Sequence, residues 1–111
     1  MKVYDIKSDM PNVSDAGKRL ASAIKEAKTN KEKVIKILHG YGSHGVGGSI
    51  KIAVRKSLSK KIKTNEIKAY IPGEAFASLM GFDEVIREYK DLIKNDSDYN
   101  KMNDGITYVI L

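Results

Sequence analysis

The chain is 111 residues long, with 41% apolar and 31% charged residues and a formal net charge of +6 at pH 7. This length predicts one domain over residues 1–111, and the absence of cysteine excludes disulfides and cysteine-ligated zinc. No apolar run has the length of a membrane span and the N-terminus lacks the apolar block of a signal peptide, so we expect a cytoplasmic protein without membrane contact.

The first half of the chain predicts two strands with a helix between them. Residues 3–6 alternate in polarity, as a short strand does, and Ser14 is expected to cap a helix over 14–28. Over 34–39 the apolar residues occur at both parities, which predicts a strand buried on both faces. A loop dense in glycine follows this second strand.

The second half repeats the alternation. Ser49 is expected to cap a helix over 50–62, residues 67–71 predict a third strand, Asp83 is expected to cap a third helix, and 106–111 predict the last strand. The order βαβαβαβ predicts a parallel or mixed sheet of four strands with the first two helices packed on it. The expected core contains Val34, Ile35, Ile37, Val54, Leu58, Val109 and Ile110.

The glycine-dense loop is the candidate site. Five of the nine glycines lie between Gly40 and Gly48, and the only two histidines, His39 and His44, lie in or beside the same loop. Ligands of α/β sheets bind beyond the carboxyl ends of strands, where a loop leads into a helix. The sequence therefore places a ligand next to this loop.

Two nucleotide motifs fit the loop poorly. Residues 40–45, GYGSHG, match the dinucleotide pattern GxGxxG, but three more residues precede the expected cap at Ser49, whereas the helix should open within the motif. Residues 42–49 have the spacing of a P-loop, but Gly48 stands where a P-loop has the lysine that reaches the phosphates.

A third interpretation treats the loop and the following helix as one anion-binding device. Amide groups at a helix start attract phosphate, and glycines allow close approach. Residues 51–63 contain lysine and arginine but no acid, so positive charge extends past a single phosphate, which favours a nucleic-acid backbone. The residues expected to contact nucleic acid are Gly40, Gly42, His44, Gly45, Ser49, Lys51, Arg55 and Lys56.

These features together resemble the Smr (small MutS-related) domain, whose pattern is an apolar strand, HGxGxGxL, and an amphipathic helix. The strand VIKIL is followed by HGYG at 39–42 and GSI at 48–50, with Val54 and Leu58 continuing the helix in step. The ending NDGITYVIL resembles the terminal turn and strand of the family. The resemblance implies an α/β two-layer sandwich similar to the C-terminal domain of translation initiation factor three.

The resemblance also implies binding of DNA or RNA and, in some members, endonuclease activity with or without a metal. Two departures stand out. Where the family commonly has LDLHG at the end of the first strand, Asp5 is kept but Lys7 takes the histidine place. Residues 72–103 are longer than the usual family connection and add a helix. This segment could cover a sheet edge or dock a partner, and we favour the cover.

Cleavage of a phosphodiester needs a general base or acid and groups that stabilise the charged transition state. His39 is the candidate base or acid, because its ordinary pKa is about 6.5. Asp5 is the candidate to orient His39 or to bind a metal. The amides of Gly40 and Gly42 would hold the phosphate, with Lys51 or Arg55 as the cation. Two histidines and scattered acids form no metal-ligand cluster, so we expect no cofactor.

Three function classes follow from the sequence: an endonuclease that acts through His39, a non-catalytic nucleic-acid module, and a protein-interaction domain whose basic helix is a soluble face. The missing first histidine favours the second class over the first. Salt dependence separates both from the third, because phosphate contacts weaken steeply with salt. The sequence decides neither DNA against RNA nor the oligomeric state.

Overall fold

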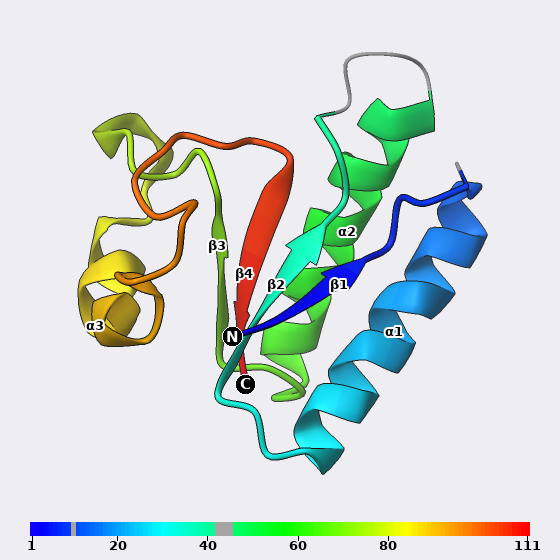
Figure 1. Ribbon diagram of the computed structural model, residues 1–111, viewed down its shortest axis with the longest axis horizontal. Coiled ribbons are helices and arrows are strands. Elements are labelled where there is room, and N and C mark those ends of the chain that lie inside the picture. The colour runs from blue at the N-terminus through cyan, green and yellow to red at the C-terminus, as the bar shows by residue number, and fades with distance from the viewer. Residues whose placement is uncertain (10, 42–45) are drawn as a thin grey trace.

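The computed structural model describes residues 1–9, 11–41 and 46–111, which form a four-stranded mixed sheet with three α-helices (Figure 1). The predicted α/β class and the predicted order of strands and helices are confirmed. In chain order the elements are β1 (Lys2–Asp5), α1 (Val13–Thr29), β2 (Val34–Leu38), α2 (Val46–Lys63), β3 (Ala69–Pro72), the 3-10 turn η1 (Ser78–Met80), α3 (Asp83–Ile93) and β4 (Ile106–Ile110).

The strand order is β1-β2-β4-β3, with β1 parallel to β2 and β4 antiparallel to both of its neighbours. Because β4 lies between β2 and β3, those two strands run in the same direction, and α2 connects them across β4. The carboxyl ends of β1, β2 and β3 therefore meet the amino end of β4 at one edge of the sheet, at the top of Figure 1. The candidate loop leaves from this edge.

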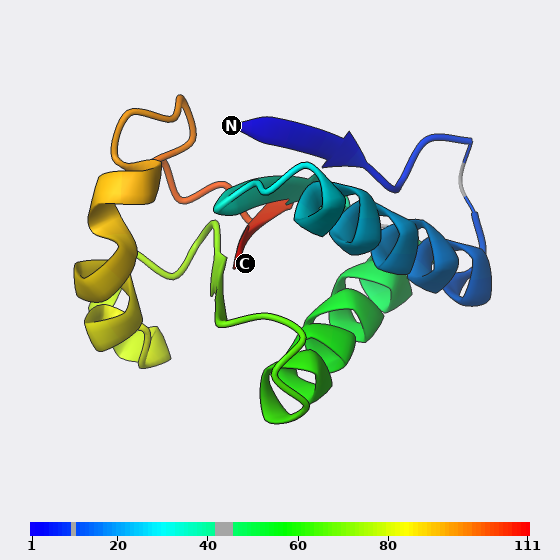
Figure 2. The same ribbon diagram turned by 90° about the horizontal axis from the view of Figure 1, so that it is seen from below.

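Helices α1 and α2 cover one face of the sheet (Figure 2). Val54 and Leu58 of α2 are buried against Ile35, Ile37 and Val109 of the central strands. Burial of side chains of this size stabilises a fold by roughly 1.5–3 kcal/mol each. All seven residues predicted for the core are buried: Val34, Ile35, Ile37, Val54, Leu58, Val109 and Ile110.

The segment between β3 and β4 covers the opposite face, where α3 lies (Figure 2). The central strands are apolar on both faces, so this second face also needs cover. Ile71, Tyr108 and Ile110 are buried there, together with Ile93 of α3. The extension at 72–103 thus does more than the predicted cover of an edge, because it adds a partial third layer to the two-layer sandwich.

The helix starts differ from those predicted. Asn12, not Ser14, caps α1, since its side-chain oxygen accepts a hydrogen bond from the amide of Asp15 at 2.8 Å. Helix α2 begins at Val46, so Ser49 lies in its first turn rather than at its cap. Packing of the following turns onto the sheet outweighs the roughly 1 kcal/mol that each glycine costs in a helix. Asp83 is the first residue of α3 and makes no capping hydrogen bond.

Helix α2 opens earlier than predicted, but it opens after residues 40–45 and not within them, so the spacing still departs from that of a dinucleotide fingerprint. The sheet supplies another argument. Dinucleotide folds use a parallel, doubly wound sheet, whereas β2 here is paired with the antiparallel β4. Among the described residues, no helix is both long and apolar enough to span a membrane.

Candidate nucleic-acid interface

His39 follows β2 and is buried, with 1% of its surface exposed. Its Nδ1 lies 2.9 Å from the carbonyl oxygen of Gly40, and its Nε2 lies 2.8 Å from the hydroxyl of Thr107. A carbonyl only accepts, so Nδ1 carries the proton, and the Thr107 hydroxyl donates to Nε2. Both ring nitrogens therefore have partners within the protein.

The environment keeps His39 neutral at physiological pH. Burial lowers its pKa from the ordinary 6.5 to about 4, and the positive charges of Arg55 and Lys51 act in the same direction. The hydrogen bond to Gly40 and the charge of Glu74 oppose the shift only in part. In this conformation His39 orders the end of β2, and a role as base or acid requires Nε2 to leave Thr107.

Lys51 and Arg55 of α2, which the sequence predicted as cations for a phosphate, lie beside this histidine but are already paired with carboxylates. The Arg55 guanidinium donates two hydrogen bonds to the Glu74 carboxylate, at 2.6 and 2.7 Å, and one of 3.3 Å to Thr107. The Lys51 ammonium lies 3.3 Å from Glu74 and 3.5 Å from Asp104. The side chains of Lys51 and Arg55 are only 19% and 17% exposed.

The cause is the position of these residues on the helix. Lys51 and Arg55 are each one residue away from a core position, Ile50 and Val54, so they border the sheet instead of facing solvent. Glu74 reaches them from the end of β3. Although burial raises the pKa of Glu74, the Arg55 hydrogen bonds and charge hold it below its ordinary value. Two cations and two carboxylates cancel here, which leaves little net charge for a phosphate.

The remaining positions of the predicted interface have mixed outcomes. The Gly40 amide was predicted to hold a phosphate. It instead donates a hydrogen bond to the carbonyl of Gly105 at 3.1 Å, so it is not free for a phosphate. Ser49 and Lys56 are exposed on α2. The other predicted contacts lie outside the described residues: Gly42, His44 and Gly45.

Asp5 does not reach His39, so the prediction that it orients the imidazole was wrong. Asp5 pairs in register with Leu38, and paired residues point to the same face, whereas His39, the next residue, points to the other. The Asp5 carboxylate accepts hydrogen bonds from the amides of Lys7 and Ser8 and from the Ser8 hydroxyl, at 2.7–3.0 Å. Although partial burial raises the pKa of Asp5, these bonds hold it below its ordinary value.

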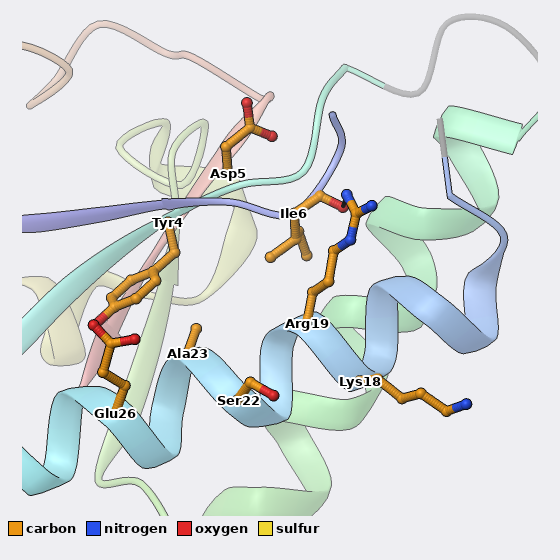
Figure 3. A pocket seen from close by; sticks show the side chains of 8 residues that line it. All are labelled: Tyr4, Asp5, Ile6, Lys18, Arg19, Ser22, Ala23 and Glu26. Carbon is orange, nitrogen blue, oxygen red and sulfur yellow. Dashed lines mark hydrogen bonds between the residues drawn. The ribbon is translucent and has the colours of Figure 1, made fainter. Parts of the chain in front are cut away.

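Figure 3 shows Asp5 at the pocket between β1 and α1. Tyr4 and Ile6 point toward α1, while Asp5 points away from it. Arg19 of α1 donates a hydrogen bond of 2.6 Å to the carbonyl of Ser8 and ties the loop after β1 to the helix. Asp5 is therefore a residue of a local turn. The described residues contain no group of three or more histidine, aspartate or glutamate side chains placed to hold a metal ion.

Three residues that complete the cluster were missed by the sequence reasoning: Thr107, Glu74 and Asp104. Thr107 could have been found from the sequence. Side chains alternate along a strand, so Thr107 points to the same face of the sheet as Val109, the face that α1 and α2 cover. A polar side chain on that face needs a partner. Glu74 and Asp104 gave no such signal, since their contacts depend on how the segment after β3 folds back.

The family comparison identifies the family of the chain. The family model of the Smr domain matches residues 9–82, which is more than half of the chain. The chain belongs to the Smr domain family. Smr domains are associated with binding of nucleic acids, and the family is related to endonucleases. Neither a curated protein nor a solved structure matches the chain.

The matched part of this Smr domain includes His39, both half-buried cations of α2 and their partner Glu74. It ends before α3 and β4, so Thr107 and Asp104 lie outside it. The carboxylate and hydroxyl partners of His39, Lys51 and Arg55 thus come partly from a region that the family model does not match. The solvent face of α2, with Lys56, lies within the match.

Proposed function

We propose that this Smr domain binds nucleic acid through the sugar–phosphate backbone, using the solvent face of α2 and the segment between β2 and α2 that leads into it. The observation that carries the proposal is the exposure of Lys56, Lys60 and Lys63 along α2 in a chain that belongs to a nucleic-acid-associated family. None of these three lysines forms an ion pair with another described residue. They are the cations of α2 that a phosphate reaches without displacing a carboxylate.

The neighbouring helix extends this charge. Lys18, Lys25 and Lys28 are exposed on α1, which packs beside α2 (Figure 2). By contrast, α3 on the other side of the sheet contains four acids and two bases in its sequence DEVIREYKDLI. A basic helical layer opposite an acidic helix orients the domain toward a polyanion.

Binding without cleavage is the activity that the geometry favours. The imidazole of His39 is buried and neutral, and its two nitrogens are engaged by Gly40 and Thr107. Asp5 lies on the other face of the sheet, so no carboxylate from β1 assists it. An endonuclease remains the second candidate on one observation, the position of His39 next to the cations Lys51 and Arg55.

The binding experiment measures the affinity of the purified chain for labelled single strands and duplexes of DNA and RNA between low and moderate salt. We expect log affinity to fall linearly with log salt, by about 0.7–0.9 per phosphate contact. The double variant Lys56→Glu/Lys60→Glu should bind at least about tenfold more weakly, with a smaller salt slope. The matched control is Lys90→Glu/Lys94→Glu, which makes the same charge change at exposed lysines of and beside α3. Equal losses in both double variants would contradict the proposed surface.

The cleavage experiment uses supercoiled plasmid and structured RNA, with and without divalent metal. We expect no cleavage by the wild-type chain above that of a mock purification. If cleavage is seen and His39→Ala lowers it by roughly 100-fold, the usual scale for a general acid or base, then the endonuclease assignment replaces the binding-only assignment. Circular dichroism of His39→Ala separates this result from loss of the fold.

A further inference from the structure

One aromatic side chain differs from all the others. The chain has six tyrosines, two phenylalanines and no tryptophan. Tyr41 is 62% exposed and belongs to neither hydrophobic cluster. The other seven aromatic residues are buried or packed against one of the two clusters: Tyr4, Tyr70, Phe76, Phe82, Tyr89, Tyr99 and Tyr108. An exposed ring has no role in the core, and an aromatic ring in water is a natural partner for another ring.

The backbone beside Tyr41 is shaped to let its ring lie close. A Cβ atom added to Gly105 would lie 3.1 Å from Cε1 of Tyr41, tighter than ordinary contact, so the ring rests against bare backbone. The residue before it, Gly40, has φ = +86°, a conformation that favours glycine. The carbonyl of Gly105 accepts hydrogen bonds from the amides of His39 and Gly40. These two bonds hold Gly105 next to the end of β2, where Tyr41 contacts it.

A pocket of about 230 Å³ adjoins the ring. Its volume is below the roughly 300 Å³ at which pockets for drug-sized molecules begin, so it suits a single planar ring system. Leu38 and Ile106 give it apolar walls. Asn103 and Asp98 also line it, but Asn103 donates to Asp98 at 2.9 Å and Asp98 accepts from Lys36 at 2.7 Å, so the apolar walls and the ring are what the pocket offers to a base. The pocket is lined by Gly40 and Tyr41, which follow β2.

A cation lies at the same pocket. Lys7 lines it, and the Cδ of Lys7 lies 3.4 Å from where a Cβ of Gly40 would be. Its ammonium is 3.7 Å from the Asp5 carboxylate, but the Lys7 side chain is 49% exposed. An exposed ion pair of this kind contributes little, so a phosphate can replace the carboxylate at small cost.

We propose that Tyr41 is a stacking platform for an unpaired nucleobase, with Lys7 contacting an adjacent phosphate, and that the ligand of this domain is therefore single-stranded nucleic acid. The proposal rests on the proposed function and deepens it. In a duplex the faces of the bases are covered by their neighbours, and only unpaired bases can stack on a protein ring. Lysines on α2 attract either form of nucleic acid, whereas Tyr41 selects one.

The first test compares affinities for a single-stranded oligonucleotide and for a duplex of the same length. Tyr41→Ala should weaken single-strand binding by about 5-fold to 100-fold, the range for loss of one base–aromatic stack, and change duplex binding by less than about twofold. Tyr41→Phe should bind like wild type, because the ring is retained. Gly105→Ala should weaken single-strand binding alone, since its methyl group displaces the ring.

The second test uses fluorescence. The chain has no tryptophan, so the Tyr41→Trp variant carries a single indole whose emission reports stacking directly. We expect quenching by the single strand and little change with the duplex. The control variant is Leu79→Trp, at a position that is 96% exposed and does not line the pocket, and its emission should not change.

The outcomes separate the two proposals. If the wild-type chain binds single strands and Tyr41→Ala binds them equally well, the stacking platform is overturned and the proposed function stands. If the wild-type chain binds no nucleic acid at any salt concentration, both are overturned. If a free mononucleotide quenches the Tyr41→Trp indole at the same concentration as the oligonucleotide, the pocket is a nucleotide site, and the assignment to a strand is overturned.

Discussion

Helix α2 has basic residues both on the side that borders the sheet and on the side that faces solvent, but the two groups differ in exposure and in ion pairing. Lys51 and Arg55 border the sheet, are less than a fifth exposed and are neutralised by Glu74. Lys56 and Lys60, on the solvent side of the same helix, are exposed. A count of basic residues along the helix treats all four alike, although only the second pair is free to attract a polyanion at long range.

The difference comes from the segment between β3 and β4. It supplies Glu74 and Asp104 to the cations of α2. On the other face of the sheet it supplies Asp96 and Asp98 to Lys36 of β2, with N–O distances of 2.9 and 2.7 Å. Cations that lie against the sheet therefore stabilise the attachment of this segment, and cations that face solvent are available for binding.

The largest effect is expected at Lys36, whose side chain is 7% exposed. Lys36→Met should lower the free energy of unfolding by about 4 kcal/mol, because it leaves two carboxylates and the Tyr108 hydroxyl network without their cation. Urea unfolding measures the loss. The control Lys68→Met removes an exposed lysine and should change stability by less than about 0.5 kcal/mol. Equal stability of the two variants would mean that the buried cluster does not hold the segment.

The next effect concerns pH and His39. The folded ring stays neutral down to about pH 4, whereas the ring in the unfolded chain takes up a proton near pH 6.5. The unfolded state therefore binds more protons between these values, so the stability from His39 is full above pH 6.5 and is lost as pH falls toward 4. The difference amounts to about 3 kcal/mol.

The measurement is urea unfolding at pH 7 and pH 4.5 for the wild type and His39→Gln. The variant lacks the titrating ring, so its stability should fall less on acidification than that of the wild type. The depressed carboxylates, such as Asp96, contribute equally to both chains and cancel in this comparison. Parallel pH profiles would show that His39 is accessible to protons in the folded state.

A smaller loss of stability is expected when a cation on the sheet side of α2 is replaced, and almost none when a cation on its solvent side is replaced. Arg55→Gln should lower the free energy of unfolding by about 2 kcal/mol, because the half-buried Glu74 carboxylate loses its bidentate partner and keeps only Lys51. Lys56→Gln should change it by less than about 0.5 kcal/mol. Thermal or urea unfolding of the two single variants gives the contrast directly, and a cost at Lys56 as large as that at Arg55 would contradict it.

The smallest effect is on salt dependence. Lys63→Gln should reduce the slope of log affinity against log salt by about 0.7–0.9, the value of one phosphate contact. Lys51→Gln should leave the slope unchanged, because its ammonium is already neutralised by Glu74 and Asp104. Titration of the labelled single strand with sodium chloride measures both, and a reduced slope for Lys51→Gln would place a phosphate at the His39 cluster.

Sequence patterns predicted much of this fold for a clear reason. The spacing of apolar residues reports which face of an element is buried, and Val54 and Leu58 on α2 are buried as their four-residue spacing requires. The same spacing placed Lys51 and Arg55 one turn apart on the helix. The spacing did not show that Lys51 and Arg55 lie beside the sheet. A shift of one residue along a helix is enough to turn a position that faces solvent into one that borders the sheet.

By itself, the sequence determined the order of strands and helices, the glycine-dense loop after β2 and the excess of positive charge, since each depends on neighbours along the chain. Only the tertiary structure decided which cations remain free. Glu74 meets Arg55 and Asp96 meets Lys36 through contacts between residues 19 and 60 positions apart. It also decided that Asp5 and His39 lie on opposite faces of the sheet, because that depends on the register of β1 against β2. Charge pairing and strand register are long-range properties, and local patterns do not encode them.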